Sequence, residues 1–146
     1  MLRPFFRKPF AITLLACVLL SVLGFAYWHY QTRRIEARAV EVGHWVAYGV
    51  VKTNPVKLEE VVGGTRVWSG STPLFCCLRT SAGKKVIIEV WIDSALFDAK
   101  ITRVRCRMAG PVLPGEDARE LELSPDVVTG RQSVDLQEMF PDAFTD

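Results

Sequence analysis

The chain has 146 residues, of which 49% are hydrophobic, and a formal net charge of +2. This charge is unevenly divided, because residues 116–146 carry two arginines against nine acidic residues while the preceding part of the chain is basic. An acidic end repels phosphate, which excludes nucleic acid as the main partner.

Residues 10–30 are expected to form a membrane-spanning helix. They contain no Asp, Glu, Lys or Arg, and as a helix they reach about 32 Å, enough to cross a hydrocarbon core of about 30 Å. Lys and Arg are equally numerous close to both ends, so the short basic tail at residues 1–9 decides the orientation. We expect a single-pass inner-membrane protein in contact with the lipid bilayer, with a cytoplasmic N-terminus and everything from Gln31 onward in the periplasm.

Two other interpretations use the same residues. Gly24-Phe25-Ala26 resembles the cleavage site of a secretory signal peptide, and the residues before Cys17 loosely resemble a lipoprotein signal. The apolar run is long and aromatic residues crowd the first site, which favours a retained anchor over a cleaved signal. The run also continues well past Cys17, which disfavours the lipoprotein.

Residues 31–43 favour helix and are expected to continue the membrane helix as a stalk that ends at Gly43. Such a stalk is either a rigid spacer that sets the height of the domain or a simple connector. The remaining residues, 44–146, are expected to form one domain with an acidic C-terminal segment, since about 100 residues suffice for one hydrophobic core.

The first half of this domain is expected to consist of strands. Residues 44–51 are rich in aromatic and β-branched side chains, which favours a strand. Short strands are also expected at residues 58–62 and 65–68. The clearest signal is a β-hairpin formed by residues 74–80 and 85–92 around a short connection that contains a glycine.

The register of the hairpin depends on its loop. A three-residue loop with Gly83 in the left-handed conformation would pair Leu78 with Val86. A two-residue turn would shift the register by one residue and bury Phe75 and Cys77 instead. We prefer the first register, because it joins two apolar faces. The core face of the first strand then consists of Leu74, Cys76 and Leu78.

The second half of the domain begins with an expected helical turn at residues 93–99, capped by Asp93. Residues 101–108 alternate cleanly and predict a strand with arginines on one face and Val104, Cys106 and Met108 on the other. A last strand is expected at residues 118–123.

Two short helices are expected to follow, one starting at Ser124-Pro125 and one at residues 133–140, ended by Pro141. The predicted fold is therefore an N-terminal single transmembrane α-helix followed by one small β-rich domain with a short C-terminal helix. The β-rich part is expected to be mainly an antiparallel sandwich or half-open barrel.

Cys76, Cys77 and Cys106 lie in expected strands and allow three interpretations. They are inert core thiols, or Cys106 forms a disulfide with one of the other two in an oxidising compartment. Alternatively, the three thiolates bind a soft cation such as Cu(I). Adjacent residues point to opposite faces of a strand, so Cys76 and Cys77 cannot both serve one site without a bulge.

The sequence contains no pattern typical of an enzyme active site. Its two histidines, His29 and His44, have no evident partner for acid–base catalysis. The motifs of serine hydrolases, zinc proteases, phosphate-binding loops and dinucleotide-binding folds are absent. We therefore expect a protein that is not an enzyme, binds no cofactor or metal, and has no small-molecule substrate.

Two surfaces are candidates for binding a protein partner. The first is a basic stripe. It is a solvated sheet face, an edge strand charged to prevent pairing between sheets, or a docking surface for an acidic partner, for the chain's own acidic tail, or for anionic headgroups. The second is the C-terminal helix, which is either a flap that closes the core or a docking peptide. The stripe consists of Arg79, Arg103, Arg105 and Arg107, and the helix presents Met139, Phe140 and Phe144.

These features together predict a non-enzymatic, membrane-anchored envelope protein that is an accessory or assembly subunit of a larger membrane protein complex. One alternative is a thiol- or copper-handling factor that uses Cys76, Cys77 and Cys106. Another is a periplasmic immunity or inhibitor protein that blocks a toxin with a charged face.

Overall fold

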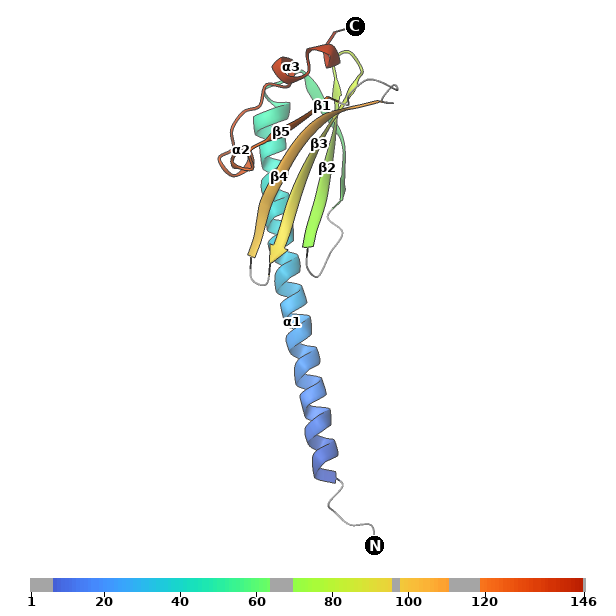
Figure 1. Cartoon of the computed structure of the whole chain (residues 1–146), viewed down its shortest axis with the longest axis vertical. Coiled ribbons are helices and arrows are strands. Elements are labelled where there is room, and N and C mark those ends of the chain that lie inside the picture. Colours follow the sequence, from blue (N-terminus) through green and yellow to red (C-terminus); the bar gives the residue numbers. More distant parts are fainter. Residues whose placement is uncertain (1–6, 64–69, 96–97, 111–118, 146) are drawn as a thin grey trace.

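The protein consists of a long N-terminal helix, an antiparallel sheet of five strands and short C-terminal helices (Figure 1). The expected fold class, a helix of transmembrane length followed by one small β-rich domain with a short C-terminal helix, is confirmed. In the described part of the chain the layer that packs on the sheet is the long helix, not a second sheet, so the sheet stays open. The computed structural model describes residues 7–63, 70–95, 98–110 and 119–145.

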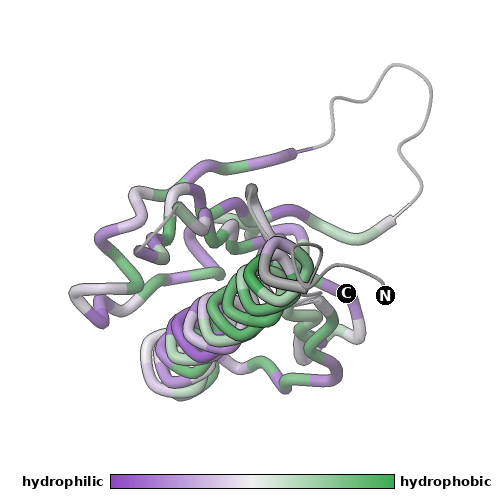
Figure 2. Tube along the Cα trace, turned by 90° about the horizontal axis from the view of Figure 1, so that it is seen from below, coloured by the Kyte–Doolittle hydropathy of each residue, from purple (hydrophilic) through white to green (hydrophobic). Residues whose placement is uncertain are grey.

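The long helix α1 (Arg7–Trp45) is 39 residues long and continues into a π-helical turn, η2 (Val46–Val51). Its first half projects away from the domain and exposes apolar side chains such as Leu14 and Phe25. By length and composition, this is a helix that is able to span a membrane. Figure 2 shows the change along α1 from an apolar first half to a polar second half.

The segment 31–43 is helical, as expected, but it packs against the sheet instead of forming a free stalk, and Gly43 does not end it. Ile35 and Val42 are buried in the core. Their spacing of seven residues places them on one face of the helix. The same helix therefore forms both the apolar span and one layer of the domain.

The expected strand at residues 44–51 is wrong, because α1 continues to Trp45 and the π-helical turn follows it. Trp45, Val46 and Val50 are all fully buried, and the helical path brings them to the face that meets the core. The Nε1 atom of Trp45 also donates to the carbonyl oxygen of Gln132 at 2.9 Å. These tertiary contacts outweigh the strand preference of aromatic and β-branched residues.

The five strands form a simple meander in which each strand pairs in antiparallel fashion with the next one along the chain. They are β1 (Val56–Gly63), β2 (Gly70–Thr80), β3 (Lys85–Ala95), β4 (Asp98–Ala109) and β5 (Glu120–Leu123). The strands expected at residues 58–62, 74–80, 85–92 and 101–108 are confirmed, as is the described part of the one expected at 118–123. The strand expected at 65–68 lies outside the described residues.

The preferred register of the β2–β3 hairpin is confirmed, since Leu78 pairs with Val86. Gly83 has a φ of +79°, and the backbone N–H of Thr80 donates to the carbonyl oxygen of Lys84 at 2.8 Å. A left-handed residue in a three-residue loop is what this register requires. The side chains expected to point toward the core are Leu74, Cys76 and Leu78 on β2 and Val104, Cys106 and Met108 on β4, and all six are buried or partly buried there.

The helical turn expected at residues 93–99 is wrong, because β3 runs on to Ala95 and β4 begins at Asp98. Asp93 lies opposite Lys100 in the β3–β4 ladder. One face of an open antiparallel sheet tolerates polar side chains, so the preference of Asp for a helix cap is not used here.

The C-terminal segment contains α2 (Asp126–Thr129), α3 (Leu136–Met139) and the 3-10 turn η3 (Pro141–Ala143). The final helix is shorter than the expected 133–140, because Asp135 caps it by accepting hydrogen bonds from two backbone N–H groups. Its end before the proline agrees with the expectation.

Asn54 joins the C-terminal segment to η2. Its Nδ2 atom donates to the carbonyl oxygens of Val50 at 2.9 Å and Val134 at 2.6 Å, and its Oδ1 atom accepts from the backbone N–H of Leu136 at 2.8 Å. The side chain is buried, so these bonds replace the water that it loses on folding. Asn54 thus fixes the C-terminal segment to η2, where this segment closes the core.

Candidate interaction surface

The two faces of the sheet differ in what covers them. The inner face packs on α1 and the C-terminal segment and holds the core. In Figure 1, α1 lies behind the sheet, and no helix or strand of the described residues covers the opposite face, which we call the outer face. Its side chains include Phe75, Cys77 and Arg79 on β2, Lys85, Ile87, Glu89 and Trp91 on β3, Arg103, Arg105 and Arg107 on β4, and Glu120 and Glu122 on β5.

Two arginines of the basic stripe form ion pairs with β5. Arg103 lies 3.0 Å from Glu122, and Arg105 lies 3.0 Å from Glu120. Both acids belong to the acidic C-terminal segment. Within the fold, these two arginines of the stripe therefore contact the chain's own acidic tail. Such exposed pairs contribute about 0–1 kcal/mol each, and they leave this face locally close to neutral.

The third arginine of β4, Arg107, has a buried partner. Its Nε atom donates to Glu89 at 2.7 Å, and Glu89 is only 7% exposed although it lies on the outer face. A buried carboxylate is costly unless a cation compensates it. Arg107 is therefore needed by the fold and is not a free cation for an incoming ligand.

Arg79 is also paired within the chain. Glu59 is the extra residue of a bulge in β1, where the register shifts between Leu58 and Glu60. It accepts a hydrogen bond from Arg79 and lies 3.2 Å from the Nζ atom of Lys85. The hydrogen bonds from Arg79 and then from Lys85 lower the pKa of the Glu59 carboxyl below its ordinary value. All four arginines of the expected stripe thus have acidic partners.

Between these ion pairs the outer face carries partly buried apolar side chains, among them Phe75, Ile87 and Trp91. The Nε1 atom of Trp91 is buried and has no hydrogen-bond partner among the described residues. An aromatic centre with a charged rim is typical of protein–protein interfaces. A hollow of about 340 Å³ adjoins it, lined by Ser71, Trp91, Asp93, Thr102 and Arg103.

The C-terminal candidates lie in the core and not on a free surface. Phe140 is fully buried, and Met139 and Phe144 pack against the core cluster. The hydroxyl of Thr80 donates to the carbonyl oxygen of Ala143 at 2.6 Å, which fastens the end of the segment to β2. Of the two interpretations of this segment, the structure therefore has the flap that closes the core.

The disulfide candidates Cys76 and Cys106 lie on the same face of the sheet but are separated by strand β3. Cys76 and Cys106 both lie opposite Ile88, one on each side of it. Two strand spacings amount to about 10 Å, whereas a disulfide needs Cα atoms within about 7 Å. Cys77 lies on the outer face, opposite Ile87. The expected disulfide is not formed, and all three cysteines are free.

The thiols of Cys76 and Cys106 have the properties of core residues. Burial raises the pKa of Cys76 to about 11 and that of Cys106 to about 12, so neither is a thiolate at neutral pH. Because Cys77 points away from both, the three sulfur atoms do not converge on one site. This arrangement agrees with the interpretation as inert core thiols.

Three residues of the outer face were missed by the sequence analysis, namely Glu59, Glu89 and Trp91. For β3 a signal existed in the sequence. Ile87, Glu89 and Trp91 alternate with the residues predicted to face the core, so they must share the opposite face of the strand. For Glu59 no signal existed, since its direction depends on a bulge that only the paired sheet reveals.

No protein-family model matches this chain, and no curated protein or solved structure shows detectable similarity to it. Within the described ranges, no group of three or more His, Cys, Asp and Glu side chains is placed to hold a metal ion. The outer face is therefore the candidate functional site on the strength of its geometry.

Proposed function

We propose that this protein is a non-enzymatic, membrane-anchored subunit of a larger membrane protein complex, and that its outer face binds a partner protein. One observation carries the proposal: α1 forms both the span of transmembrane length and the inner layer of the domain. The outer face is the opposite side of a domain that is fixed where the span ends.

Three polar contacts hold the domain to α1 immediately beyond the span, and they support this role. Gln31 donates to the carbonyl oxygen of Ala95 at 2.7 Å, and Arg38 donates to that of Ala99 at 2.8 Å. Arg34 lies 3.5 Å from Asp98. A domain held in this way presents its outer face at a defined height and angle, which favours contact with a neighbour in the same membrane.

The chemistry of the outer face favours a folded protein over a simple anionic ligand. The arginines already have acidic partners within the chain, so they present alternating charges and no net basic surface. Alternating charge around aromatic side chains supplies specificity and shape to a protein interface.

For the location we propose the inner membrane, with the N-terminus in the cytoplasm and the domain in the periplasm. The motivation is the short basic segment before the span. The test combines a periplasmic activity reporter fused after Asp146 with the mass of the mature chain. We expect an active reporter and full length. An inactive reporter would contradict the orientation, and a chain that starts near Tyr27 would contradict the retained anchor.

Site-specific photo-crosslinking in intact cells tests the partner. A photoreactive phenylalanine analogue replaces Phe75 or Trp91 on the outer face, and Tyr48 as the control. Tyr48 is aromatic and 64% exposed, but it lies on η2. We expect one discrete crosslinked species from the outer-face positions and none from Tyr48, because only the outer face meets the partner.

A charge exchange provides the second arm of this test. The variant Arg103→Glu exchanges an exposed cation beside the hollow for an anion and leaves the buried pair of Arg107 and Glu89 intact. We expect its capture through Phe75 to fall several-fold, because like charges then face each other across the interface. Equal capture at Tyr48, or capture that the exchange leaves unchanged, would contradict a specific interface on the outer face.

A further inference from the structure

A second hollow lies on α1, at the level where the apolar span ends. It has a volume of about 550 Å³, and its described lining comes from α1 alone. It lies on a different flank of the helix from Arg34 and Arg38, which contact β4. It is also separate from the outer face. The lining residues are Trp28, His29, Thr32, Arg33, Glu36, Ala37 and Val40.

Arg33 is the residue of this hollow with hydrogen-bond donors available to a ligand. Its Nε atom donates to the Nε2 atom of His29 at 3.1 Å, which orients the guanidinium and leaves the N–H groups of both Nη atoms for another partner. Arg34 pairs with Asp98 and Arg38 pairs with Glu41. In contrast, Arg33 has no carboxylate partner among the described residues.

The other polar side chains of the hollow are already engaged. The hydroxyl of Thr32 donates to the carbonyl oxygen of Trp28 at 2.9 Å. Glu36 makes an interaction of its own within the chain. The exposed guanidinium of Arg33 is thus the group that sets the preference of this hollow, and that preference is for an anion.

The depth of Arg33 matches the phosphate layer of a bilayer. Residues 10–30 contain no charged side chain, so Arg33 is the first one after the span. Three residues of helix place it about 4.5 Å beyond Tyr30, and the headgroup layer extends about 5–7 Å beyond the hydrocarbon core. Trp28 in the wall is a residue type that prefers this boundary.

The same flank of α1 continues into the apolar span. Val22 and Phe25 lie below His29 and Arg33 at helical spacing, and both are exposed. The ring of Phe25 stacks on that of His29, with 6.5 Å between the centroids. A phospholipid whose acyl chain lies along Val22 and Phe25 would place its phosphate at Arg33. A free phosphate ion would make no contact with these apolar side chains.

From these observations we propose that this hollow binds the headgroup of one anionic phospholipid, with Arg33 forming charge-assisted hydrogen bonds to the phosphodiester. The occupant is a lipid of the phosphatidylglycerol type. It would secure the domain against the membrane surface on the flank of α1 that carries Arg33.

The test uses the full chain in nanodiscs that contain phosphatidylglycerol and phosphatidylcholine in equal amounts. Native mass spectrometry counts the lipids that stay bound after release. The variant is Arg33→Gln, and the matched control is Arg34→Gln, which removes the same charge from the adjacent position. We expect Arg33→Gln to weaken retention of phosphatidylglycerol about tenfold, the loss typical of one charge-assisted hydrogen bond. The control should stay within about twofold of the parent chain.

Three outcomes would overturn the proposal. Equal losses in the two variants would indicate general attraction between basic residues and an anionic membrane. Equal retention of phosphatidylcholine would remove the preference for an anionic headgroup. Displacement of the lipid by soluble glycerol phosphate would assign the site to a free phosphate group. Circular dichroism of both variants verifies that the fold is kept, as expected for exposed side chains.

Discussion

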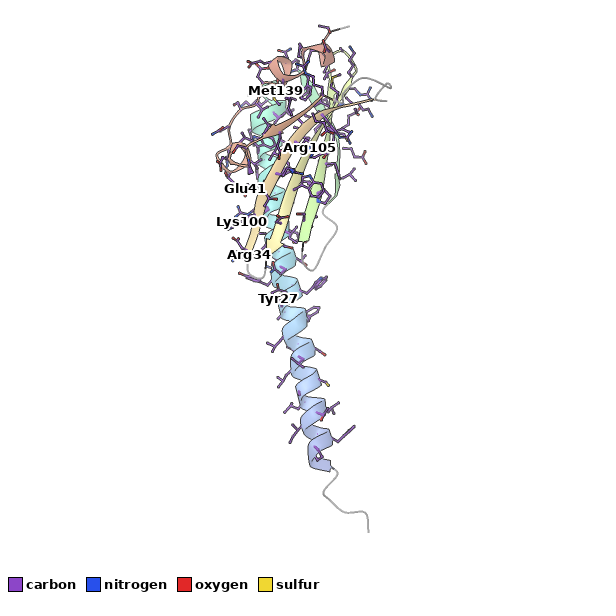
Figure 3. All side chains as sticks on the ribbon, viewed as in Figure 1. Tyr27, Arg34, Glu41, Lys100, Arg105 and Met139 are labelled. Atoms are coloured by element: carbon purple, nitrogen blue, oxygen red, sulfur yellow. The ribbon has the colours of Figure 1, made fainter. Side chains whose placement is uncertain are left out.

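The side-chain amide of Gln31 donates a hydrogen bond of 2.7 Å to the backbone carbonyl of Ala95. Gln31 is the first residue after the apolar span, and Ala95 is the last residue of β3. This contact bridges 64 positions of sequence and places that end of the sheet directly at the end of the span. Figure 3 shows Tyr27 just below this end of the sheet and Arg34 beside it.

Removing this contact should loosen the end of the sheet nearest to the span. We expect Gln31→Ala to lower the free energy of unfolding by about 0.5–1.5 kcal/mol, because it removes a part-buried hydrogen bond. Hydrogen exchange in detergent should report faster exchange in β3 and β4 near Ala95 and Asp98. The control Gln137→Ala, on the exposed side of α3, should leave exchange there unchanged. Equal exchange in both variants would contradict this role.

The ion pairs of the outer face should differ strongly in their effect on stability. We expect Arg107→Met to lower the free energy of unfolding by about 2–4 kcal/mol, because it removes the ion-pair partner of the buried carboxylate of Glu89. Arg103→Met should cost less than about 1 kcal/mol, since Glu122 stays in water. Chemical denaturation of the full chain in detergent measures both.

A second variant distinguishes the charge of Glu89 from the packing of Arg107. Replacing the acid as well, in Glu89→Gln/Arg107→Met, should recover part of the loss, because no buried charge then remains. If the double variant is as unstable as Arg107→Met, the apolar stem of the arginine, and not its charge, supports the fold.

Two glycines of the helical segment should respond in opposite ways to alanine. At Gly49 a Cβ atom would lie 2.7 Å from the carbonyl oxygen of Gln132 and 2.9 Å from the ring of Trp45. We expect Gly49→Ala to destabilise the domain by about 1–3 kcal/mol, since backbone must move. At Gly43 nothing lies within 4 Å, so Gly43→Ala should stabilise the helix by about 0.5–1 kcal/mol. Thermal unfolding of both variants measures the contrast, and a gain at Gly49 would contradict the close approach to Gln132.

The buried thiols should make the protein less stable at alkaline pH. Burial raises the pKa of Cys76 to about 11 and of Cys106 to about 12 in the folded chain, from an ordinary value of 9.0. The unfolded chain therefore loses these protons first as pH rises. Their stabilising contribution is fully present below about pH 9 and is lost as pH rises through the folded-state values.

Melting temperatures measured against pH check this sign. We expect Cys106→Val to have a shallower decline above pH 9.0, the ordinary thiol pKa, than the parent chain, because one of the two buried acids is gone. Val90→Ala, which changes the same core but removes no ionisable group, serves as the control and should keep the pH dependence of the parent chain. Parallel curves for the parent chain and Cys106→Val would show that other groups cause the decline.

Local patterns in the sequence were sufficient for the parts of this fold that depend on short-range geometry. The uncharged run at residues 10–30 predicts a span, because length and apolarity alone decide whether a helix can cross a bilayer. The alternation around Leu78 and Val86 predicts the register of the β2–β3 hairpin, since a shift of one residue would turn the apolar side chains outward. The alternation in β4 likewise predicts its arginine face.

What the tertiary structure alone decided is the role of the segments between these patterns. Residues 44–51 have strand composition, yet burial of Trp45, Val46 and Val50 against the sheet keeps them helical. Whether the arginines are free or paired depended on Glu59 and Glu89, which a bulge and neighbouring strands bring to them. Composition and periodicity encode what each residue prefers locally. The partner of a side chain is set by contacts between distant parts of the chain, and these form only when the whole core closes.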